Sequence, residues 1–288
     1  MTLPWTYSAF PSRREGTWPN GARVALWVAV GVESYRADDG ITEDILPRGA
    51  APDLVNAAWR DYGNRVGAFR LFERLAEIGI RPAVLLNTDV YDEAPEVLAA
   101  ARAAGSEIVG HGRSNSDSLT TLPPGEEEAY VSGVASRIEA EEGTRPGGWS
   151  SPWLAHTPTS LASLATAGYR YLLDLRLDDQ PVWLDAGAGR MLAIPYAAEL
   201  NDSTTMIGRQ MDARSFADMI RDEAGEFFTS KRPVVMSVVL HSFISGQPWR
   251  LRPIADALAE VAATDGVWCA TPSEIHAAVA STPDLAAG

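Results

Sequence analysis

Residues 24–32, VALWVAVGV, followed directly by ESY at 33–35, decide the fold class of this chain. Nine almost entirely apolar residues predict a strand that is buried on both faces, as in a parallel sheet covered by helices. Beyond it, short β-branched runs alternate with longer stretches of helical periodicity as far as residue 279. This alternation predicts an α/β fold, and both a doubly wound sheet and a barrel agree with it.

The remaining elements continue this alternation. Strands are predicted at 82–86, 108–109, 171–173, 191–194, 234–240 and 267–269, with a short one near Trp149. Helices are predicted at 65–78, 95–104, 126–142, 159–167, 215–228, 251–263 and 272–280. These elements give about seven β/α units with no linker between them, which favours one domain. We place that domain at 18–282, with an N-terminal extension at 1–17 and a C-terminal tail at 283–288.

The composition excludes several classes of protein. The chain has 288 residues, 38 acidic and 24 basic side chains, and a formal net charge of −14. Because this charge repels phosphate backbones and anionic lipid, we expect neither nucleic acid nor a membrane as a partner. The apolar runs are far shorter than the roughly 20 residues of a bilayer span, and residues 1–16 lack the apolar core of a secretory signal. With a single cysteine and no intramolecular disulfide, we expect a cytoplasmic protein.

Chemistry-bearing side chains follow three of the predicted strands. Glu33 comes directly after the first strand, His111 lies in Gly-His-Gly after the strand at 108–109, and His241 ends the strand at 234–240. Because the carboxyl ends of parallel strands meet at one end of such folds, we expect the three side chains to lie together. A carboxylate and imidazoles form an acid/base set, in which Glu33 deprotonates water and a histidine protonates a leaving nitrogen. The alternative for each residue alone is that it satisfies buried backbone groups.

Other kinds of site have less support. His111 has Asn115 at the i+4 position, which is a poor zinc ligand, and the four histidines give no convincing set of three ligands. No Gly-x-Ser-x-Gly elbow and no phosphate-binding glycine loop is present, so a nucleotide cofactor is not expected. Trp149, Trp153 and Trp249 flank the polar loops, where they form either an aromatic wall for a ring substrate or part of the core.

At this point the loops resemble the polysaccharide deacetylase superfamily, which has the carbohydrate esterase family 4 fold, and in particular its allantoinase-like branch. The stretches that match are WPNGAR at 18–23, YGNRVG at 62–67, GHG at 110–112, DDQP at 178–181, PY at 195–196, ELND at 199–202 and LHSFISGQP at 240–248. The match extends over nearly the whole chain. The resemblance implies an α/β fold in a single domain, a distorted (β/α)7 barrel.

The resemblance also bears on metal binding. Metal-dependent members have an aspartate base followed by an aspartate ligand after the first strand, and then a His-x-x-x-His pair. The corresponding positions here are Glu33, Ser34, His111 and Asn115. Two of the three metal ligands are therefore replaced by weak ones, whereas the base position keeps a carboxylate and the acid position keeps His241. We expect no cofactor, and zinc is the less favoured alternative.

The expected lack of a metal restricts the substrate. A metal polarises an amide carbonyl and lowers the pKa of bound water to about 7, so a site without one needs a more reactive carbonyl and hydrogen-bond donors for the oxyanion. Cyclic imides, hydantoin-like rings and ureides leave as stabilised nitrogen anions. The allantoinase-like branch implies the same class, because its members open cyclic ureides and related members open cyclic imides.

Our first hypothesis is a metal-independent hydrolase that opens a carbon–nitrogen bond, other than a peptide bond, in a small cyclic amide, imide or ureide. Glu33 activates water, His241 protonates the leaving nitrogen, and His111 orients the substrate or stabilises the oxyanion. The predicted substrate-binding residues are Asn115, Trp149, Ser150, Trp153, Asp179, Asn201 and Trp249. Asp179, like Asn64 and Arg65, either binds substrate or holds the loops, and for these three residues the structural role is favoured. Relatives suggest a homo-oligomer.

Two alternatives stay open. One is a metal-dependent N-deacetylase of an N-acetylated sugar or small amide, with Glu33, His111 and either Asp174 or Asp178 as ligands. The other is a non-catalytic ring-binding protein that has kept the fold.

Overall fold

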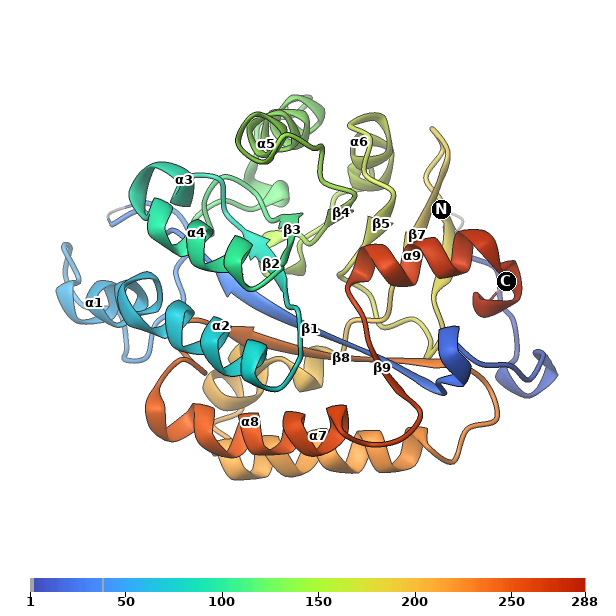
Figure 1. Cartoon of the computed structure of the whole chain (residues 1–288). Helices are drawn as coiled ribbons and strands as arrows, with labels where there is room; N and C mark the ends of the chain where they lie inside the picture. The colour runs from blue at the N-terminus through green and yellow to red at the C-terminus, as the bar shows by residue number, and fades with distance from the viewer. Residues whose placement is uncertain (1–2, 38, 288) are drawn as a thin grey trace.

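The computed structural model describes residues 3–37 and 39–287, in which one curled sheet forms a half-barrel surrounded by helices (Figure 1). The strands are β1 Val24–Val32, β2 Ala83–Leu86, β3 Glu107–Gly110, β4 Gly148–Trp149, β5 Tyr171–Leu172, β6 Val182–Asp185, β7 Arg190–Ala193, β8 Val234–His241 and β9 Val267–Cys269. Their order is β6-β7-β5-β4-β3-β2-β1-β8, and β9 pairs with β1. The strand pairs are parallel except β6 with β7. The predicted α/β (β/α)7 barrel in a single domain is confirmed.

The helices cover the outside of this sheet. They are α1 Leu54–Tyr62, α2 Ala68–Glu77, α3 Val90–Glu93, α4 Pro95–Ala103, α5 Glu127–Glu142, α6 Ser160–Thr166, α7 Ala213–Phe227, α8 Pro248–Ala262 and α9 Pro272–Ser281. Helices α7 and α8 pack on each other along β8, below the sheet in Figure 1. Helices α5 and α6 pack together on the opposite side.

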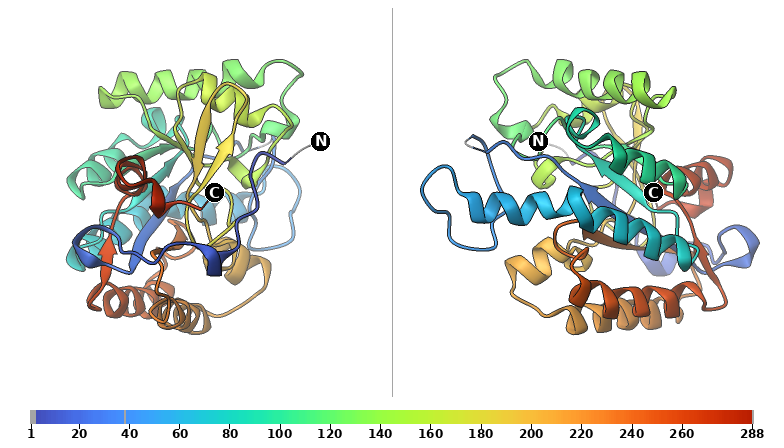
Figure 2. Two further views of the ribbon diagram at one scale, coloured as in Figure 1. Left: turned by 90° about the vertical axis from the view of Figure 1, so that its right-hand side faces the viewer. Right: turned by 60° about the vertical axis from the view of Figure 1, so that its left-hand side comes forward.

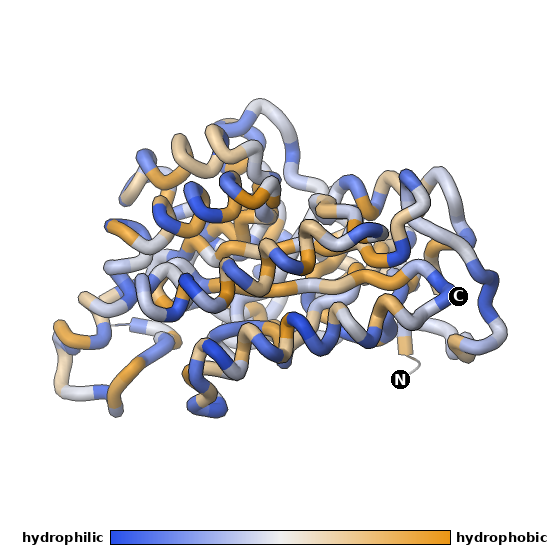
Figure 3. Tube along the Cα trace, turned by 60° about the horizontal axis from the view of Figure 1, so that its bottom comes forward, coloured by the Kyte–Doolittle hydropathy of each residue, from blue (hydrophilic) through white to orange (hydrophobic). Residues whose placement is uncertain are grey.

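Strand β1 lies at the centre of the fold, and all nine of its residues are buried. Its first three residues pair with β8 on one edge and β9 on the other, and its later residues pair with β8 and β2. A strand with neighbours on both edges and side chains packed on both faces has no solvent-facing position, which explains its continuous apolar sequence. In Figure 3 the central strands are mostly orange, whereas the helices around them alternate between blue and orange.

Three of the helices and strands were not predicted from the sequence, namely helix α1, the four-residue helix α3 and strand β6. Helix α1 continues through a π-helical turn at Gly63–Gly67 into α2, so the helical stretch begins well before the predicted start at residue 65. The sequence of α1 shows no clear apolar stripe facing the core, because its apolar residues Leu54 and Val55 are exposed, at 70% and 60%. Strand β6 was missed because it is a four-residue edge strand in a hairpin, and only two of its residues are buried. The other predicted strands and helices are present, with ends that differ by up to three residues.

Close packing of glycines brings the α1–α2 helix against the turn that follows β8. A Cβ on Gly67 would overlap the carbonyl oxygen of Ser242, and a Cβ on Gly63 would overlap the hydroxyl of the same serine. Gly246 contributes the facing side of this contact. Only glycine permits so close an approach of two backbones. The contact fixes the π-helical turn, which carries Asn64, beside the end of β1.

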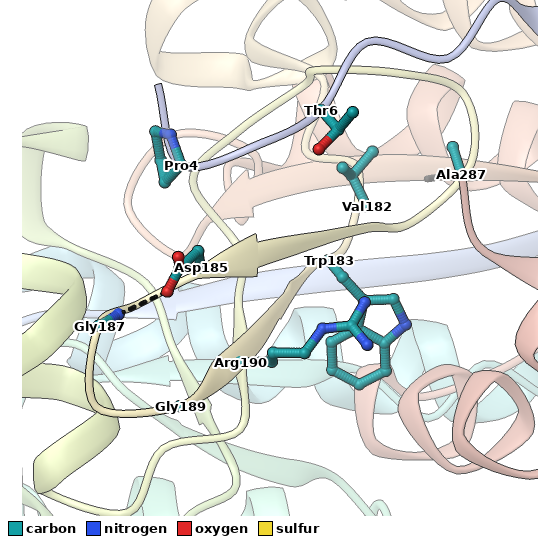
Figure 4. A pocket seen from close by; sticks show the side chains of 9 residues that line it. All are labelled: Pro4, Thr6, Val182, Trp183, Asp185, Gly187, Gly189, Arg190 and Ala287. Carbon is teal, nitrogen blue, oxygen red and sulfur yellow. Dashed lines mark hydrogen bonds between the residues drawn. The ribbon is translucent and has the colours of Figure 1, made fainter. Parts of the chain in front are cut away.

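The two ends of the described chain lie against the β6–β7 hairpin (Figure 2). The backbone N–H of Asp185 donates to the carbonyl of Pro4, and that of Ala287 donates to the carbonyl of Pro181. These are the segments expected as an N-terminal extension at 1–17 and a C-terminal tail at 283–288. Between them and the hairpin is an open pocket of about 500 Å³, which Trp183 and the other residues labelled in Figure 4 line.

In the residues that the structure describes, no helix is both long enough and apolar enough to span a bilayer.

Candidate active site

The end of β1 places Glu33 between two imidazoles. Its side chain is 1% exposed, and Oε1 lies 3.3 Å from Nε2 of His241 and 3.7 Å from Nε2 of His111. Its other oxygen, Oε2, accepts hydrogen bonds from the hydroxyl of Tyr35 at 2.6 Å and from Nδ2 of Asn115 at 3.0 Å. The three residues predicted to form the acid/base set therefore lie together, from the ends of β1, β3 and β8.

The surroundings of Glu33 hold it in the ionised form. Burial raises its pKa, but the positive charge of His241 and the nearby imidazole of His111 more than offset this, so the pKa lies below its usual range. Nearby positive charge favours a carboxylate even where burial opposes it. Glu33 is thus an anion at neutral pH and is able to accept a proton.

His241 is kept in its positively charged form with the help of a second carboxylate, that of Asp202. Its Nδ1 lies 2.5 Å from Oδ1 of Asp202, and its backbone N–H donates to Oδ2 of the same residue at 2.8 Å. The hydroxyl of Ser245 also donates to Asp202. Burial lowers the pKa of His241, but Glu33 and Asp202 raise it well above the usual value. His241 is therefore a cation whose Nε2–H points toward Glu33.

His111 is oriented by a backbone carbonyl. Its Nδ1 lies 2.7 Å from the carbonyl oxygen of Ser150, and because that oxygen can only accept, Nδ1 carries a proton. Nε2 is therefore the atom that faces Glu33. In the neutral ring Nε2 accepts a hydrogen bond, and it donates one to an oxyanion only when the ring is protonated. The side chain of Asn87 donates to the backbone carbonyl of His111 and accepts from the N–H of Ser34, which joins the ends of β1 and β3.

No family model matches the chain. A curated protein of Schizosaccharomyces pombe (strain 972 / ATCC 24843), named "Putative polysaccharide deacetylase", is 22% identical over an alignment of 294 residues that covers 90% of this chain and 90% of that protein. The solved structure of the probable polysaccharide deacetylase of Pseudomonas aeruginosa PAO1 has a TM-score of 0.83 at 21% identity and covers 92% of this chain and 93% of that one. The Puue allantoinase structure has a TM-score of 0.87 at 20% identity, with 98% and 99% covered.

The chain therefore resembles the polysaccharide deacetylase superfamily in its fold and over most of its sequence. The predicted resemblance is thereby confirmed. At identities this low the solved structures establish the fold and not the reaction.

The residues present do not fit the metal that some superfamily members bind. Of the positions that resemble metal ligands, Ser34 offers a hydroxyl, Asn115 turns its amide nitrogen toward Glu33 and Tyr35, and His111 alone is a good zinc ligand. Asp174 pairs instead with His156, and Asp178 pairs with Arg13, so neither completes a ligand set with Glu33 and His111. Over residues 3–37 and 39–287, no group of three or more His, Cys, Asp or Glu side chains is arranged to hold a metal.

Asn115 and Tyr35 together replace one side of such a metal site. Nδ2 of Asn115 donates to the hydroxyl of Tyr35 at 2.7 Å as well as to Glu33, and the Tyr35 hydroxyl donates to Glu33. Burial, followed by the charge of Glu33, raises the pKa of Tyr35 well above its usual value, so its hydroxyl keeps its proton. Oδ1 of Asn115 is buried and has no hydrogen-bond partner among the described residues. A buried acceptor of this kind is suited to a donor on a ligand.

Two further predicted residues lie near this centre. Ser150 is buried and orients His111 through its carbonyl, while its hydroxyl donates to the carbonyl of Leu173. Trp153 is 37% exposed, and its indole N–H donates to the carbonyl of Asn115 at 2.8 Å. Of the predicted aromatic residues, Trp153 therefore lies beside Asn115, which in turn contacts Glu33.

Three predicted substrate contacts need correction. Trp149 is fully buried against Tyr169, because β4 directs it into the core, so it forms no wall of the site. Trp249 is 62% exposed and lines a groove between α7 and α8 on the outer surface. The carbonyl of Asp179 accepts from the N–H of Val235, which is six residues before His241 and thus about 20 Å away along β8.

Asn201 is held by hydrogen bonds within its own loop. Its Nδ2 donates to the hydroxyl of Tyr196, and its Oδ1 accepts from the N–H groups of Ser203 and Thr204. These bonds cap the π-helical turn Ser203–Gly208 and position the adjacent Asp202.

Sequence reasoning missed Tyr35 and Asp202 as members of the site. Tyr35 lies two residues beyond Glu33, and Asp202 ends the ELND stretch that resembles the superfamily. One indication was available for each residue. Tyr35 is a polar residue just after a strand, and Asp202 follows Asn201, which forms an isolated β-bridge with Val239 of β8.

Proposed function

We propose that this protein is a metal-independent hydrolase that opens a carbon–nitrogen bond in a small cyclic amide, imide or ureide. The observation that carries the proposal is the pair of opposite charges at the centre, where Glu33 is an anion and His241 a cation with Oε1 and Nε2 3.3 Å apart. A base that is ionised and an acid that is protonated at the same pH are the two groups that amide hydrolysis needs.

In the proposed reaction, Glu33 takes a proton from a water molecule as its oxygen bonds to the ring carbonyl carbon. The carbon–nitrogen bond then breaks, and Nε2–H of His241 gives its proton to the leaving nitrogen. Asp202 remains hydrogen-bonded to Nδ1 and holds the imidazole in position throughout. Transfer of the proton from Glu33 to His241 restores both groups for the next turnover.

The substrate class follows from the donors and acceptors around this pair. Oδ1 of Asn115, buried and without a partner among the described residues, is suited to accept a ring N–H. His111 is the available oxyanion donor, and it serves in this way when it is protonated at Nε2. Two carboxylates besides Glu33, those of Asp202 and Glu43, act on His241 from nearby, which disfavours an anionic substrate. A neutral ring with an N–H and an activated carbonyl meets these requirements.

The proposal is consistent with the names of the similar proteins, which include an allantoinase and polysaccharide deacetylases. An allantoinase acts on a cyclic ureide, the class that the site favours. A deacetylase of N-acetylated sugars is the competing function. That reaction cleaves an unactivated amide, which in metal-dependent enzymes is helped by a metal ion, and no side-chain set arranged to hold one is found in the described residues.

The test is a ring-opening screen of purified protein on allantoin, hydantoin and succinimide, with and without a strong chelator. We expect turnover of at least one ring, unchanged by chelation, and loss of turnover with preserved folding in Glu33→Gln and His241→Ala. His276→Ala, on α9, is the matched histidine control and should retain full activity. Loss of activity on chelation that zinc restores contradicts the metal-independent part. Ring binding without any turnover supports a non-catalytic protein instead.

A further inference from the structure

One buried carboxylate holds both ends of the loop after β4. The side chain of Asp174, which follows β5, is fully buried, and its Oδ1 accepts a hydrogen bond from the backbone N–H of Ser151 at 2.8 Å. Oδ2 of the same side chain lies 2.8 Å from Nε2 of His156. Residues 151–156, which we call the Trp153 loop, are therefore closed by Asp174 from the first residue to the last.

The backbone inside the Trp153 loop is strained. Trp153 has φ of 61° and Leu154 has φ of 52°, so two consecutive residues with side chains adopt the left-handed conformation. Each such residue costs on the order of 1 to 3 kcal/mol and persists only where its surroundings impose the conformation. The contacts of Asp174 at both ends of the loop are a constraint of that kind.

The strained conformation directs the indole of Trp153 toward the catalytic centre. Its Nε1–H donates to the carbonyl of Asn115, and the side chain of Asn115 in turn donates to Glu33. The indole is thus separated from the base by one residue, and 37% of Trp153 is still exposed. A partly exposed aromatic face beside a reacting centre is suited to packing on a flat ring.

The charges around His156 favour the closed loop. Two acidic groups face it, Asp174 from the end of β5 and Glu127 from the start of α5. Burial lowers the pKa of His156, but Asp174 and then Glu127 raise it above the usual value. Glu127 also accepts hydrogen bonds from the hydroxyls of Thr157 and Thr159, which fix the chain just after the loop.

We propose that Asp174 and His156 are positioning residues that fix Trp153 as a wall of the substrate site and so give the site its preference for flat rings. The substrate part rests on the proposed function, whereas the positioning of Trp153 rests on the loop geometry alone. The two parts are therefore tested separately.

The positioning part is tested through the indole N–H of Trp153, observed by NMR and assigned as the signal that disappears in Trp153→Phe. We expect this N–H to be protected from exchange with water in the wild-type protein, and the protection to fall by about tenfold or more in His156→Gln and Asp174→Asn, because the ion pair that closes the loop is lost. His276→Gln should leave the protection unchanged. Because His156 is partly exposed, His156→Gln is expected to fold even if the buried Asp174→Asn does not. Unchanged protection in His156→Gln overturns the positioning role.

The substrate part is tested by kinetics on whichever of hydantoin, succinimide or allantoin the wild-type protein opens. We expect His156→Gln and Trp153→Ala each to raise KM by about tenfold with kcat changed little, since they remove binding and not proton transfer. In a Trp153→Ala background, His156→Gln should add little, because both changes act through the same indole. Fully additive effects on KM contradict the proposal. If the wild-type protein opens none of these rings, the proposed function fails, while the NMR result still decides the positioning role.

Discussion

Glu33 and His241 owe their charged states mainly to each other, and His241 also to Asp202. Burial alone would favour the neutral form of both side chains, yet each is kept charged by the other. Asp202 adds a second negative charge on the far side of the imidazole, so His241 remains a cation even when Glu33 becomes protonated during the reaction. Asp202, which lies outside the proposed reacting pair, thus helps to keep His241 protonated.

The first prediction concerns pH. The proposed reaction requires ionised Glu33 and protonated His241, so the rate should form a plateau that falls in acid as Glu33 gains its proton and in base as His241 loses its own. Because the pKa of Glu33 is lowered and that of His241 is raised, the pH range of the plateau should be wider than for a glutamate and a histidine with ordinary pKa values. Measurement of kcat/KM from strongly acidic to alkaline pH checks this, and a narrow bell centred near neutrality contradicts it.

The same pKa shifts determine how the free energy of unfolding changes with pH. Glu33, with a lowered folded pKa, contributes stability that is present above its unfolded pKa and is lost as pH falls through the folded one. His241, with a raised folded pKa, contributes stability that is present below its unfolded pKa and is lost as pH rises through the folded one. The contribution of the pair is therefore largest between about pH 4.3 and 6.5, the unfolded values.

The second prediction isolates Asp202. Replacing it by Asn keeps the shape but removes the charge that raises the pKa of His241, so the alkaline limb of the rate profile should move to lower pH. We also expect kcat to fall on the order of 10²-fold, because the imidazole loses its orienting acceptor. Asp185→Asn, an exposed change on β6, is the matched control. An unmoved alkaline limb in folded Asp202→Asn would show that Asp202 is structural only.

At the scale of elements, what could be predicted depended on how strongly each element is buried. Strands β1 and β8 are buried along their whole length, so their apolar runs were unambiguous. Strand β6 and helix α1 lie at edges where the apolar side chains are partly or largely exposed, and they gave no such signal. Glu33, His111 and His241 could be placed together because each ends a parallel strand. Tyr35 and Asp202 could not, because loop conformation decides where their side chains lie.

The third prediction tests the glycine contact between the α1–α2 helix and the turn after β8. In Gly67→Ala the new Cβ overlaps the carbonyl of Ser242, so the two backbones must separate, at a cost of about 1 to 3 kcal/mol in unfolding free energy. The matched control is Gly133→Ala in α5, where a Cβ meets no atom within 4 Å, and it should stabilise the protein by about 0.5 to 1 kcal/mol. Urea denaturation measures both changes. A neutral Gly67→Ala would mean that the helix shifts without strain.

At the scale of the whole molecule, the curl and stagger of the sheet explain why neighbouring motifs in the sequence separate in space. Asp174 and Asp179 are five residues apart, yet Asp174 closes the Trp153 loop while Asp179 contacts the early part of β8. A barrel-like sheet staggers its strands, so a short connection carries the chain from one end of the fold to the other. The sequence pattern identifies the strands but not this stagger, and for that reason Asp179 was misplaced. A homo-oligomer and a cytoplasmic location stay predictions.

The fourth prediction concerns how the N-terminal segment closes the fold at the end away from Glu33. Arg13 makes a bidentate ion pair with Asp178, and both side chains are largely buried, at 10% and 17% exposed. Its guanidinium also donates to Gln180 and to the backbone of Ser8, so it ties residues 8–13 to the strand β6 region. Arg13→Ala leaves Asp178 without its partner, and we expect a loss of about 1 to 3 kcal/mol in unfolding free energy, because the pair is only partly shielded from water.

The neighbouring Arg14 provides the control for this prediction. It pairs with Asp284, but both side chains are exposed, at 80% and 60%, so Arg14→Ala should change stability by less than about 1 kcal/mol. Urea denaturation compares the two variants, and ring-opening activity below the unfolding transition should be the same in both as in the wild-type protein. Equal stabilities for Arg13→Ala and Arg14→Ala would mean that residues 8–13 are held by their backbone hydrogen bonds alone. A loss of activity in folded Arg13→Ala would instead show that the N-terminal segment influences the catalytic end through β8, along which the two ends of the barrel are joined.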